Sequence, residues 1–304
     1  MTKKKIYVWA CDYSKSTGEG NLGRLFVNTE LKKIYRINIC QYKPKNSLTR
    51  FLFNYKYIRP FKGILNCWKY FLIGEKTCYL NYLPFWNFFL FILLPPNTIL
   101  GPITGGSNYR KAFSLNYFIR RFVFPIFYKI SCIILSFRNS KIFFSTSLLK
   151  KYLSSNLKNK SSFNFVLRAL MFKKRTLKKN ADFVIYYRHH KNKLTFYPIK
   201  FIKILLSYRY NVYIVGDKLN IEGVKNLGFL NRTKLEKILS KCKFSISSGE
   251  NLLSFFFIEC LSYKIKILTN NKIPNLNASI KKKLIYFNPN KNYNKFQIKI
   301  LLKK

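Results

Sequence analysis

Acidic residues are scarce in this 304-residue chain: Asp and Glu together number 10, against 57 Lys and Arg, and the formal net charge is +47. Such an imbalance favours a polyanionic partner, such as nucleic acid, an anionic lipid surface or a phosphorylated substrate. Lys is nevertheless spread along the whole chain, in runs no longer than Lys3–Lys5 or Lys281–Lys283. The chain therefore lacks the basic arm or tail that is typical of nucleic-acid binders.

Histidine and paired cysteines are also scarce. The two histidines, His189 and His190, are adjacent in the sequence, so their side chains point apart and cannot share a metal ion easily. The 7 cysteines are scattered, and none forms a Cys-x-x-Cys pair. These absences argue against a disulfide framework and against a structural zinc site, and they fit a reduced compartment.

Apolar runs long enough to cross a bilayer are absent as well. Residues 85–94 cover about half of a membrane span, and residues 122–137 are interrupted by a proline and a lysine. Residues 1–5 are basic but precede a short β-rich run, which is not the pattern of a signal peptide. We therefore expect a cytoplasmic protein. The aromatic runs near Arg120 and Arg121 leave peripheral attachment to an anionic inner membrane as an alternative.

What the chain has is apolar surface: 48% of its residues are hydrophobic and 18% are aromatic. Short β-rich runs alternate with helix-compatible segments, which predicts an α/β fold with mostly parallel sheets. A stretch rich in Ser, Asn and Lys around residues 154–180 indicates a boundary. We place one domain at residues 1–160 and another at residues 161–304, the second one short at its C-terminal end. Its strands are expected at residues 183–187, 211–215, 224–227, 244–247 and 265–269.

Each carboxylate carries information in so basic a chain. Glu250 and Glu259 bracket a segment that follows a predicted strand and begins a helix. A helix that starts at the carboxyl edge of a parallel sheet presents free backbone N–H groups to a phosphate or diphosphate. Carboxylates beside it can bind sugar hydroxyls through charge-assisted hydrogen bonds. The plain alternative is a helix cap and a surface charge.

The order of motifs over residues 182–270 resembles the retaining GT-B glycosyltransferases of the glycosyl transferases group 1 type. Ser247–Glu250 and Glu259–Ser262 look like the carboxylate pair of that family. Val212–Asp217 is similar to its strand ending in Val-Gly-Asp, and Asn226–Leu230 to its Leu-Gly-Phe turn. Tyr187–Lys193 resembles its Gly-Arg loop, in which a Lys lies five residues after the Arg.

The resemblance implies two Rossmann-like domains facing a central cleft, an N-terminal acceptor domain and a C-terminal nucleotide-sugar-binding domain. It implies transfer of a sugar, with retention of configuration, from a nucleotide diphosphate sugar to a cell-envelope glycan or a lipid-linked acceptor, as in polysaccharide biosynthesis. No metal or other cofactor is implied, because the chain has no Asp-x-Asp motif and basic side chains with a helix terminus can neutralise the diphosphate.

Residue roles follow from the same resemblance. Arg188 and Lys193 would neutralise the leaving diphosphate, and Glu250 would hold the donor sugar. The resemblance also implies that Glu259 binds the ribose and that Gly228 and Phe229 lie against the base. The backbone amides at the start of the helix, those of Leu252, Leu253 and Ser254, would bind the diphosphate.

The first half resembles the same family through two glycine loops, at residues 18–23 and 100–106. By this resemblance their glycines let the acceptor-side backbone approach the donor closely. A dinucleotide site also has Gly-x-Gly-x-x-Gly after a strand, but no acidic residue ends the second strand near Cys40. A plain turn is the other alternative. The glycines concerned are Gly18, Gly20, Gly105 and Gly106.

Two other functions stay open. A non-catalytic basic protein would bind nucleic acid or an anionic membrane through its charge alone, although we do not expect nucleic acid as a partner of the enzyme. A degenerate transferase would fold without turnover, since eight residues separate Glu250 and Glu259 where the family has seven. For Arg188 and Lys193 the plain alternative is a solvated charge.

Overall fold

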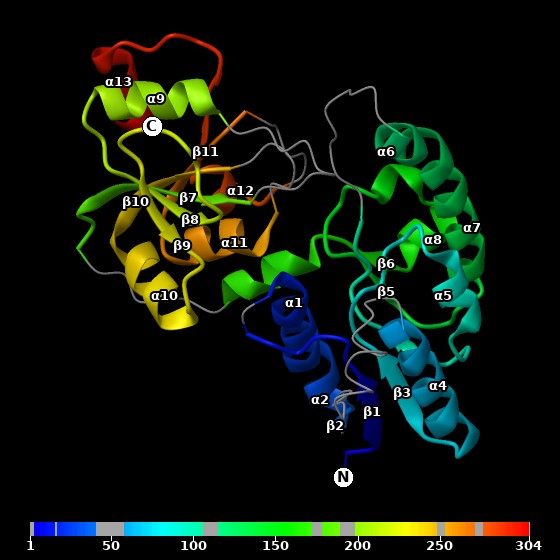
Figure 1. The fold of residues 1–304 in the computed structure, drawn as a ribbon. Coiled ribbons are helices and arrows are strands. Elements are labelled where there is room, and N and C mark those ends of the chain that lie inside the picture. The colour runs from blue at the N-terminus through cyan, green and yellow to red at the C-terminus, as the bar shows by residue number, and fades with distance from the viewer. Residues whose placement is uncertain are drawn as a thin grey trace. The chain divides into compact units, whose positions relative to one another are not determined.

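The computed structural model describes residues 3–15, 17–40, 58–105, 115–171, 178–188, 198–247, 253–270 and 276–303. They form two compact units, unit 1 up to Val166 and unit 2 from Leu167 onward. Each unit combines a parallel sheet with helices (Figure 1). The predicted α/β fold class is confirmed.

Unit 1 is built on a four-stranded parallel sheet in the order β2-β1-β3-β4. The two central strands are buried because their apolar side chains face helices on both sides: Ile6, Val8 and Tyr79 are all 0% exposed. A parallel bridge between Ile103 and Phe144 leads from this sheet to a smaller one, formed by β5 and β6. The strands are β1 (Lys5–Trp9), β2 (Arg36–Cys40), β3 (Lys76–Tyr79), β4 (Ile99–Leu100), β5 (Ile142–Phe143) and β6 (Ser161–Ser162).

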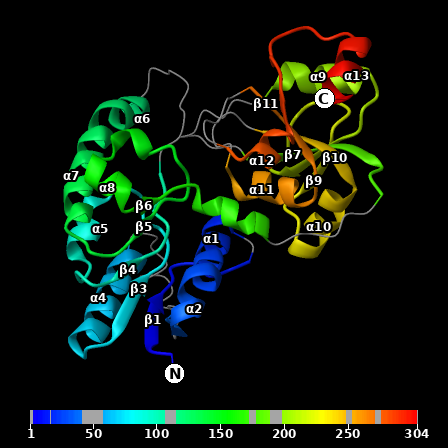
Figure 2. The ribbon, with the colours of Figure 1, turned by 180° about the vertical axis from the view of Figure 1, so that it is seen from behind.

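Helices cover both sides of the larger sheet. Figures 1 and 2 show α1 and α2 on one side and α4, α5 and α7 on the other. A π-helical turn joins α1 to α2, and another joins α6 to α7. The helices are α1 (Gly18–Phe26), α2 (Lys32–Ile34), α4 (Ile58–Leu72), α5 (Phe88–Leu93), α6 (Leu115–Phe118), α7 (Phe124–Ser136) and α8 (Ser155–Asn159).

Arg138 is buried where α7 ends, and its side chain closes the end of α5. The residue is 6% exposed and donates to five backbone carbonyls. Because the last carbonyls of a helix have no partner within it, the guanidinium supplies bonds that the chain otherwise lacks. Burial lowers the pKa of Arg138 to about 10, so the group keeps its charge at neutral pH. The acceptors are Phe91, Leu94, Pro95, Pro96 and Thr98.

Unit 2 contains a six-stranded sheet in the order β12-β11-β10-β7-β8-β9, and all of its pairings are parallel. Counted in chain order within the unit, this is the doubly wound order 3-2-1-4-5-6. The five strands expected here are found within about two residues of their predicted ends, and β12 was not predicted. The strands are β7 (Ala181–Tyr187), β8 (Val212–Gly216), β9 (Lys225–Gly228), β10 (Cys242–Ile246), β11 (Lys266–Thr269) and β12 (Leu284–Tyr286).

The helices of unit 2 lie on both faces of its sheet. Phe201 of α9 and Ile298 of α13 belong to one core with the strand residues Ile185 and Ile214, and Figure 1 shows α10, α11 and α12 away from these two helices. Within the part of the chain that the structure describes, no helix combines the length and apolarity needed to span a bilayer. The helices are α9 (Ile199–Ser207), α10 (Arg232–Lys241), α11 (Phe255–Ser262), α12 (Ala278–Lys281) and α13 (Lys295–Lys303).

Candidate functional site

The strand order of unit 2 defines one position where a ligand is expected. The chain runs outward in opposite directions from the two central strands, β7 and β10. In sheets of this kind, ligands bind at the carboxyl ends of such a pair of strands. Arg188 directly follows β7, and Ser247 directly follows β10. The sequence resemblance assigned diphosphate and sugar contacts to these same two loops. Because β7 and β10 are parallel neighbours, Arg188 and Ser247 lie at the same edge of the sheet.

Ring packing ties the end of β7 to the start of α11. The rings of Tyr186 and Phe256 stack with centroids 5.5 Å apart. Arg188, two residues after Tyr186, is exposed. Arg188 and the N-terminus of α11 are therefore both candidates for attracting an anionic group. Lys193, Glu250 and Leu252, the other residues predicted for these loops, lie outside the described residues.

The start of α11 has the geometry expected of a capped helix. Ser254 is the N-cap, and its hydroxyl accepts a bond from the Phe257 amide at 3.3 Å. Leu253 before it is buried, with 5% of its surface exposed. The cap explains Ser254 as a structural residue, and its backbone amide remains a candidate for the diphosphate.

Glu259 lies in α11 and forms an ion pair that the sequence did not reveal. Its Oε1 accepts a short hydrogen bond from Nη1 of Arg232, and the Arg232 Nε bonds Glu236 Oε1 at 2.8 Å. Burial lowers the pKa of Arg232, but the two carboxylates raise it by more, so the net shift is upward. Only 16% of the Glu259 side chain is exposed. Arg232 therefore fixes the direction of the carboxylate predicted to bind ribose.

The turn at the end of β9 is exposed. Gly228 has φ of +67°, and a Cβ added to it would meet nothing within 4 Å. The Phe229 ring beside it is 72% exposed. An exposed ring next to open backbone is suited to stacking against a base, which is the role predicted for this pair.

Gly216, the last residue of β8, pairs with Tyr187 at the end of β7. Its φ is +106°, and a Cβ would lie 2.2 Å from the carbonyl oxygen of Tyr187. The next amide, that of Asp217, donates to the same oxygen at 2.9 Å. The glycine thus allows the close strand contact that sets the backbone immediately before Arg188.

In unit 1, the loop after β1 is held by an asparagine far away in the sequence. Asn81 Oδ1 accepts from the amides of Cys11 at 3.0 Å and Asp12 at 3.4 Å, and its Nδ2 donates to the Asp12 carbonyl. The Asp12 carboxylate in turn accepts from the Ser14 amide at 2.8 Å and from the Thr17 hydroxyl. Both the backbone of Cys11 and Asp12 and the carboxylate of Asp12 are therefore hydrogen-bonded.

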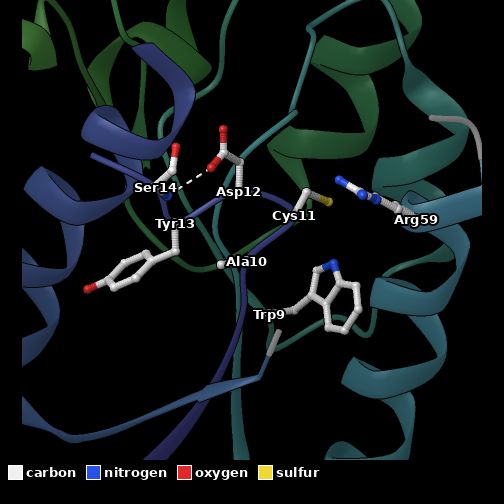
Figure 3. Close-up of a pocket in the computed structure, with 7 residues that line it drawn as sticks. All are labelled: Trp9, Ala10, Cys11, Asp12, Tyr13, Ser14 and Arg59. Atoms are coloured by element: carbon white, nitrogen blue, oxygen red, sulfur yellow. Dashed lines mark hydrogen bonds between the residues drawn. The ribbon is translucent and has the colours of Figure 1, made fainter. Parts of the chain in front are cut away.

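A pocket of about 300 Å³ opens at this loop, at the carboxyl end of β1. Figure 3 shows Arg59 reaching from α4 toward Cys11, with Asp12 and Ser14 on the other wall. From the sequence, the glycines after β1 are predicted to be functional, whereas Asp12 and Arg59 have no predicted role. A carboxylate three residues after the end of a buried strand was the available signal in the sequence. The lining residues are Trp9, Ala10, Cys11, Asp12, Tyr13, Ser14 and Arg59.

The pKa values of two carboxyl groups near this pocket are shifted in opposite directions. Burial raises the pKa of Asp12, but bonds from Thr17 and Ser14 lower it by more, so the net shift is downward. Burial raises the pKa of Glu19, and the Asp12 charge adds to that rise. Asp12 is therefore the ionised acceptor that lines the pocket and can bind a hydroxyl.

The predicted glycines of unit 1 have local explanations. A Cβ on Gly20 would lie 2.3 Å from the Ser14 carbonyl oxygen, so close packing of the loop against α1 requires glycine there. Gly105 has φ of +128°, a conformation that favours glycine. Gly18 is the exposed first residue of α1, and Gly106 lies outside the described residues.

Replacing Asp12 by Asn tests the loop. We expect a loss of about 1 kcal/mol at pH 7, because a charged acceptor is removed from a partly exposed site. Since the Asp12 pKa is lowered from 3.8, its stabilisation is present above that pH and is lost as the pH falls through the lowered value. The difference between wild type and variant should therefore shrink in acid, as measured by urea unfolding at several pH values. Glu222→Gln is the control for loss of one carboxylate, and a difference that does not change with pH would contradict the prediction.

Solved structures provide a comparison for this fold. WaaG, described as a glycosyltransferase involved in lipopolysaccharide biosynthesis, matches with a TM-score of 0.51 at 8% identity, over 98% of this chain and 90% of that one. A glycosyltransferase from Rickettsia africae ESF-5 matches with a TM-score of 0.45 at 11% identity, over 88% and 79%. No family model and no curated protein matches the sequence.

These observations define the class to which the fold belongs. Parallel α/β sheets in both units, together with the match to WaaG over nearly the whole chain, show a GT-B glycosyltransferase fold. Within the described ranges, no group of three His, Cys, Asp or Glu side chains is placed to hold a metal ion.

Proposed function

We propose that the protein is a glycosyltransferase that moves a sugar from a nucleotide diphosphate sugar to a glycan or lipid-linked acceptor of the cell envelope, with retention of configuration. The observation that carries the proposal is the position of Arg188 and Ser247 after the two central strands of a doubly wound sheet. The motif series of residues 182–270 and the glycosyltransferase fold support it.

The donor would bind to unit 2. Arg188 and the start of α11 would neutralise the diphosphate, where negative charge grows as the sugar leaves and where electrostatic stabilisation is most effective. Glu259, oriented by Arg232, would accept bonds from the ribose hydroxyls. Phe229 would stack against the base. Lys193 and Glu250 keep their proposed roles at the diphosphate and the donor sugar.

The acceptor would bind to unit 1, in the pocket beside Asp12 and Arg59. The carboxylate of Asp12 can accept a bond from a sugar hydroxyl, and the guanidinium of Arg59 can donate to an acceptor oxygen. No cofactor enters this proposal, because the charges of the chain itself act on the diphosphate.

Donor binding is the first measurement. A nucleotide diphosphate sugar at a hundred times its dissociation constant should stabilise the protein by about 2.7 kcal/mol. We expect one donor in a panel to raise the melting temperature, and Arg188→Ala to remove most of that rise because it removes a cation at the diphosphate.

Arg209→Ala is the matched control, since Arg209 is also exposed and follows a helix of the same unit away from this edge. Its donor response should equal that of wild type. If no donor stabilises the protein while nucleic acid binds tightly and in a salt-dependent way, the alternative of a basic binding protein replaces the proposal. Stabilisation without sugar transfer would identify a degenerate transferase.

A further inference from the structure

The outer face of α4 is apolar along its whole length. Its four outward side chains recur every three or four residues, which places them on one side of the helix. They are between 37% and 75% exposed. The opposite side of α4 is also apolar, because Ile64 and Cys67 pack into the core of unit 1. The outward residues are Phe61, Leu65, Trp68 and Leu72.

The neighbouring helices repeat this feature. On α5, Phe89, Ile92 and Leu93 are 42% to 62% exposed, although Leu90 and Phe91 between them are buried. The segment from α6 through α7 carries a third row of side chains, 52% to 81% exposed. This row consists of Phe118, Phe122, Ile126, Ile133 and Phe137. Isolated exposed apolar residues are normal, but three adjacent rows are not.

Direct contacts make the three rows one surface, which we call the α4–α5–α7 face. Trp68 Nε1 donates to the Leu93 carbonyl at 2.7 Å and so joins α4 to α5. The rings of Trp86 and Phe124 stack with centroids 5.4 Å apart, which joins the start of α5 to α7. These helices lie together on the side of unit 1 opposite α1 (Figures 1 and 2).

The charges on this face have one sign. The helices α4, α5, α6 and α7 and the π-helical turn between the last two contain no Asp or Glu. Their cations include Lys62, Lys69, Arg120, Arg121 and Lys129. Two of the cations contact aromatic rings of the face: the guanidinium of Arg121 lies 5.4 Å from the Phe122 ring centroid and that of Arg120 lies 5.8 Å from the Phe124 ring centroid.

A surface of bulky apolar side chains with cations and no anions complements an anionic bilayer. The aromatic and aliphatic groups can enter the boundary between headgroups and acyl chains, while Lys and Arg contact the phosphates. A specific protein interface normally combines complementary charges of both signs, whereas the described helices of this face carry no carboxylate.

We propose that the α4–α5–α7 face docks unit 1 on an anionic lipid bilayer. The proposal stands on this surface and does not require the transferase activity. If the proposed function also holds, docking would bring the pocket at Asp12 to the membrane that holds a lipid-linked acceptor.

Vesicle flotation of the full chain tests the proposal. The vesicles are phosphatidylcholine alone, or phosphatidylcholine with about 30 mol% phosphatidylglycerol, at low and high salt. The test variant is Leu65→Ser/Phe89→Ser. The matched control is Phe296→Ser/Ile300→Ser on α13 of unit 2, whose side chains are 70% and 45% exposed.

We expect wild type and the α13 control to float with the anionic vesicles, and the test variant to bind about tenfold more weakly for each side chain removed. Tryptophan emission should shift to the blue on binding. Trp68 is on this face and Trp86, which is 39% exposed, lies just before α5, whereas Trp9 is already buried.

Several outcomes would overturn the proposal. Absence of flotation at low salt would exclude a membrane partner. Unchanged binding of the test variant would mean that the net charge alone attracts the protein, and equal losses in both variants would remove the role of this face. A concentration-dependent dimer broken by Leu65→Ser/Phe89→Ser, without vesicle binding, would identify a second copy as the partner. Failure of the donor thermal shift would affect the proposed function and leave this test intact.

Discussion

Replacing Arg138 by Met is expected to lower the free energy of unfolding of unit 1 by about 3 to 5 kcal/mol. The guanidinium donates to five carbonyls in a site that is 6% exposed. Methionine fills a similar volume but donates nothing, so the carbonyls at the end of α5 would lose their partners away from water. Lys at this position should restore little, because an ammonium group cannot reach five acceptors spread over a plane.

Tryptophan emission during urea unfolding measures this effect in unit 1 alone, since the 3 tryptophans of the chain, Trp9, Trp68 and Trp86, all lie there. Arg36→Met is the control, because Arg36 is exposed on the edge strand β2 of the same unit. A loss below about 1 kcal/mol for Arg138→Met would show that the carbonyls find water or other donors, and would contradict the structural role assigned to this residue.

Gly216→Ala is expected to destabilise unit 2 by about 3 kcal/mol or more. Two costs add: a positive φ of +106° is unfavourable for alanine, and the new Cβ would lie 2.2 Å from the Tyr187 carbonyl oxygen. The backbone cannot yield easily, because the same oxygen accepts from Asp217 in the parallel pairing of β7 with β8. Any shift would move Arg188, so we expect donor stabilisation to be lost as well.

Gly223→Ala separates the two costs. Gly223 also has a positive φ, of +85°, but a Cβ there would meet its nearest atom at an ordinary 3.5 Å. This control should therefore lose only about 1 kcal/mol. Circular dichroism in urea measures both variants, and the tryptophan signal of unit 1 should stay unchanged. Equal losses for the two substitutions would mean that the contact with Tyr187 costs nothing.

The candidate site was partly readable from the sequence. Arg188 and Glu259 were located from short motifs next to a predicted strand or helix. Such motifs are local in the sequence, so they fix the position of a residue relative to the adjacent element. The Arg232–Glu259 pair joins residues 27 positions apart, and Asn81 holds Asp12 from 69 positions away. No periodicity in the sequence encodes such pairings, because they depend on which elements the sheet brings side by side.

The sequence by itself determined the α/β class and most strand positions, because apolar periodicity and turn residues are local properties that each segment carries. Tertiary structure decided which apolar side chains are exposed. Residues 88–93 are apolar throughout, yet Leu90 and Phe91 are buried while Phe89, Ile92 and Leu93 face outward. The contacts of α5 with α4 and α7 decide which of its side chains are buried. The sequence cannot decide this, because a uniformly apolar segment has no polar face that marks its exposed side.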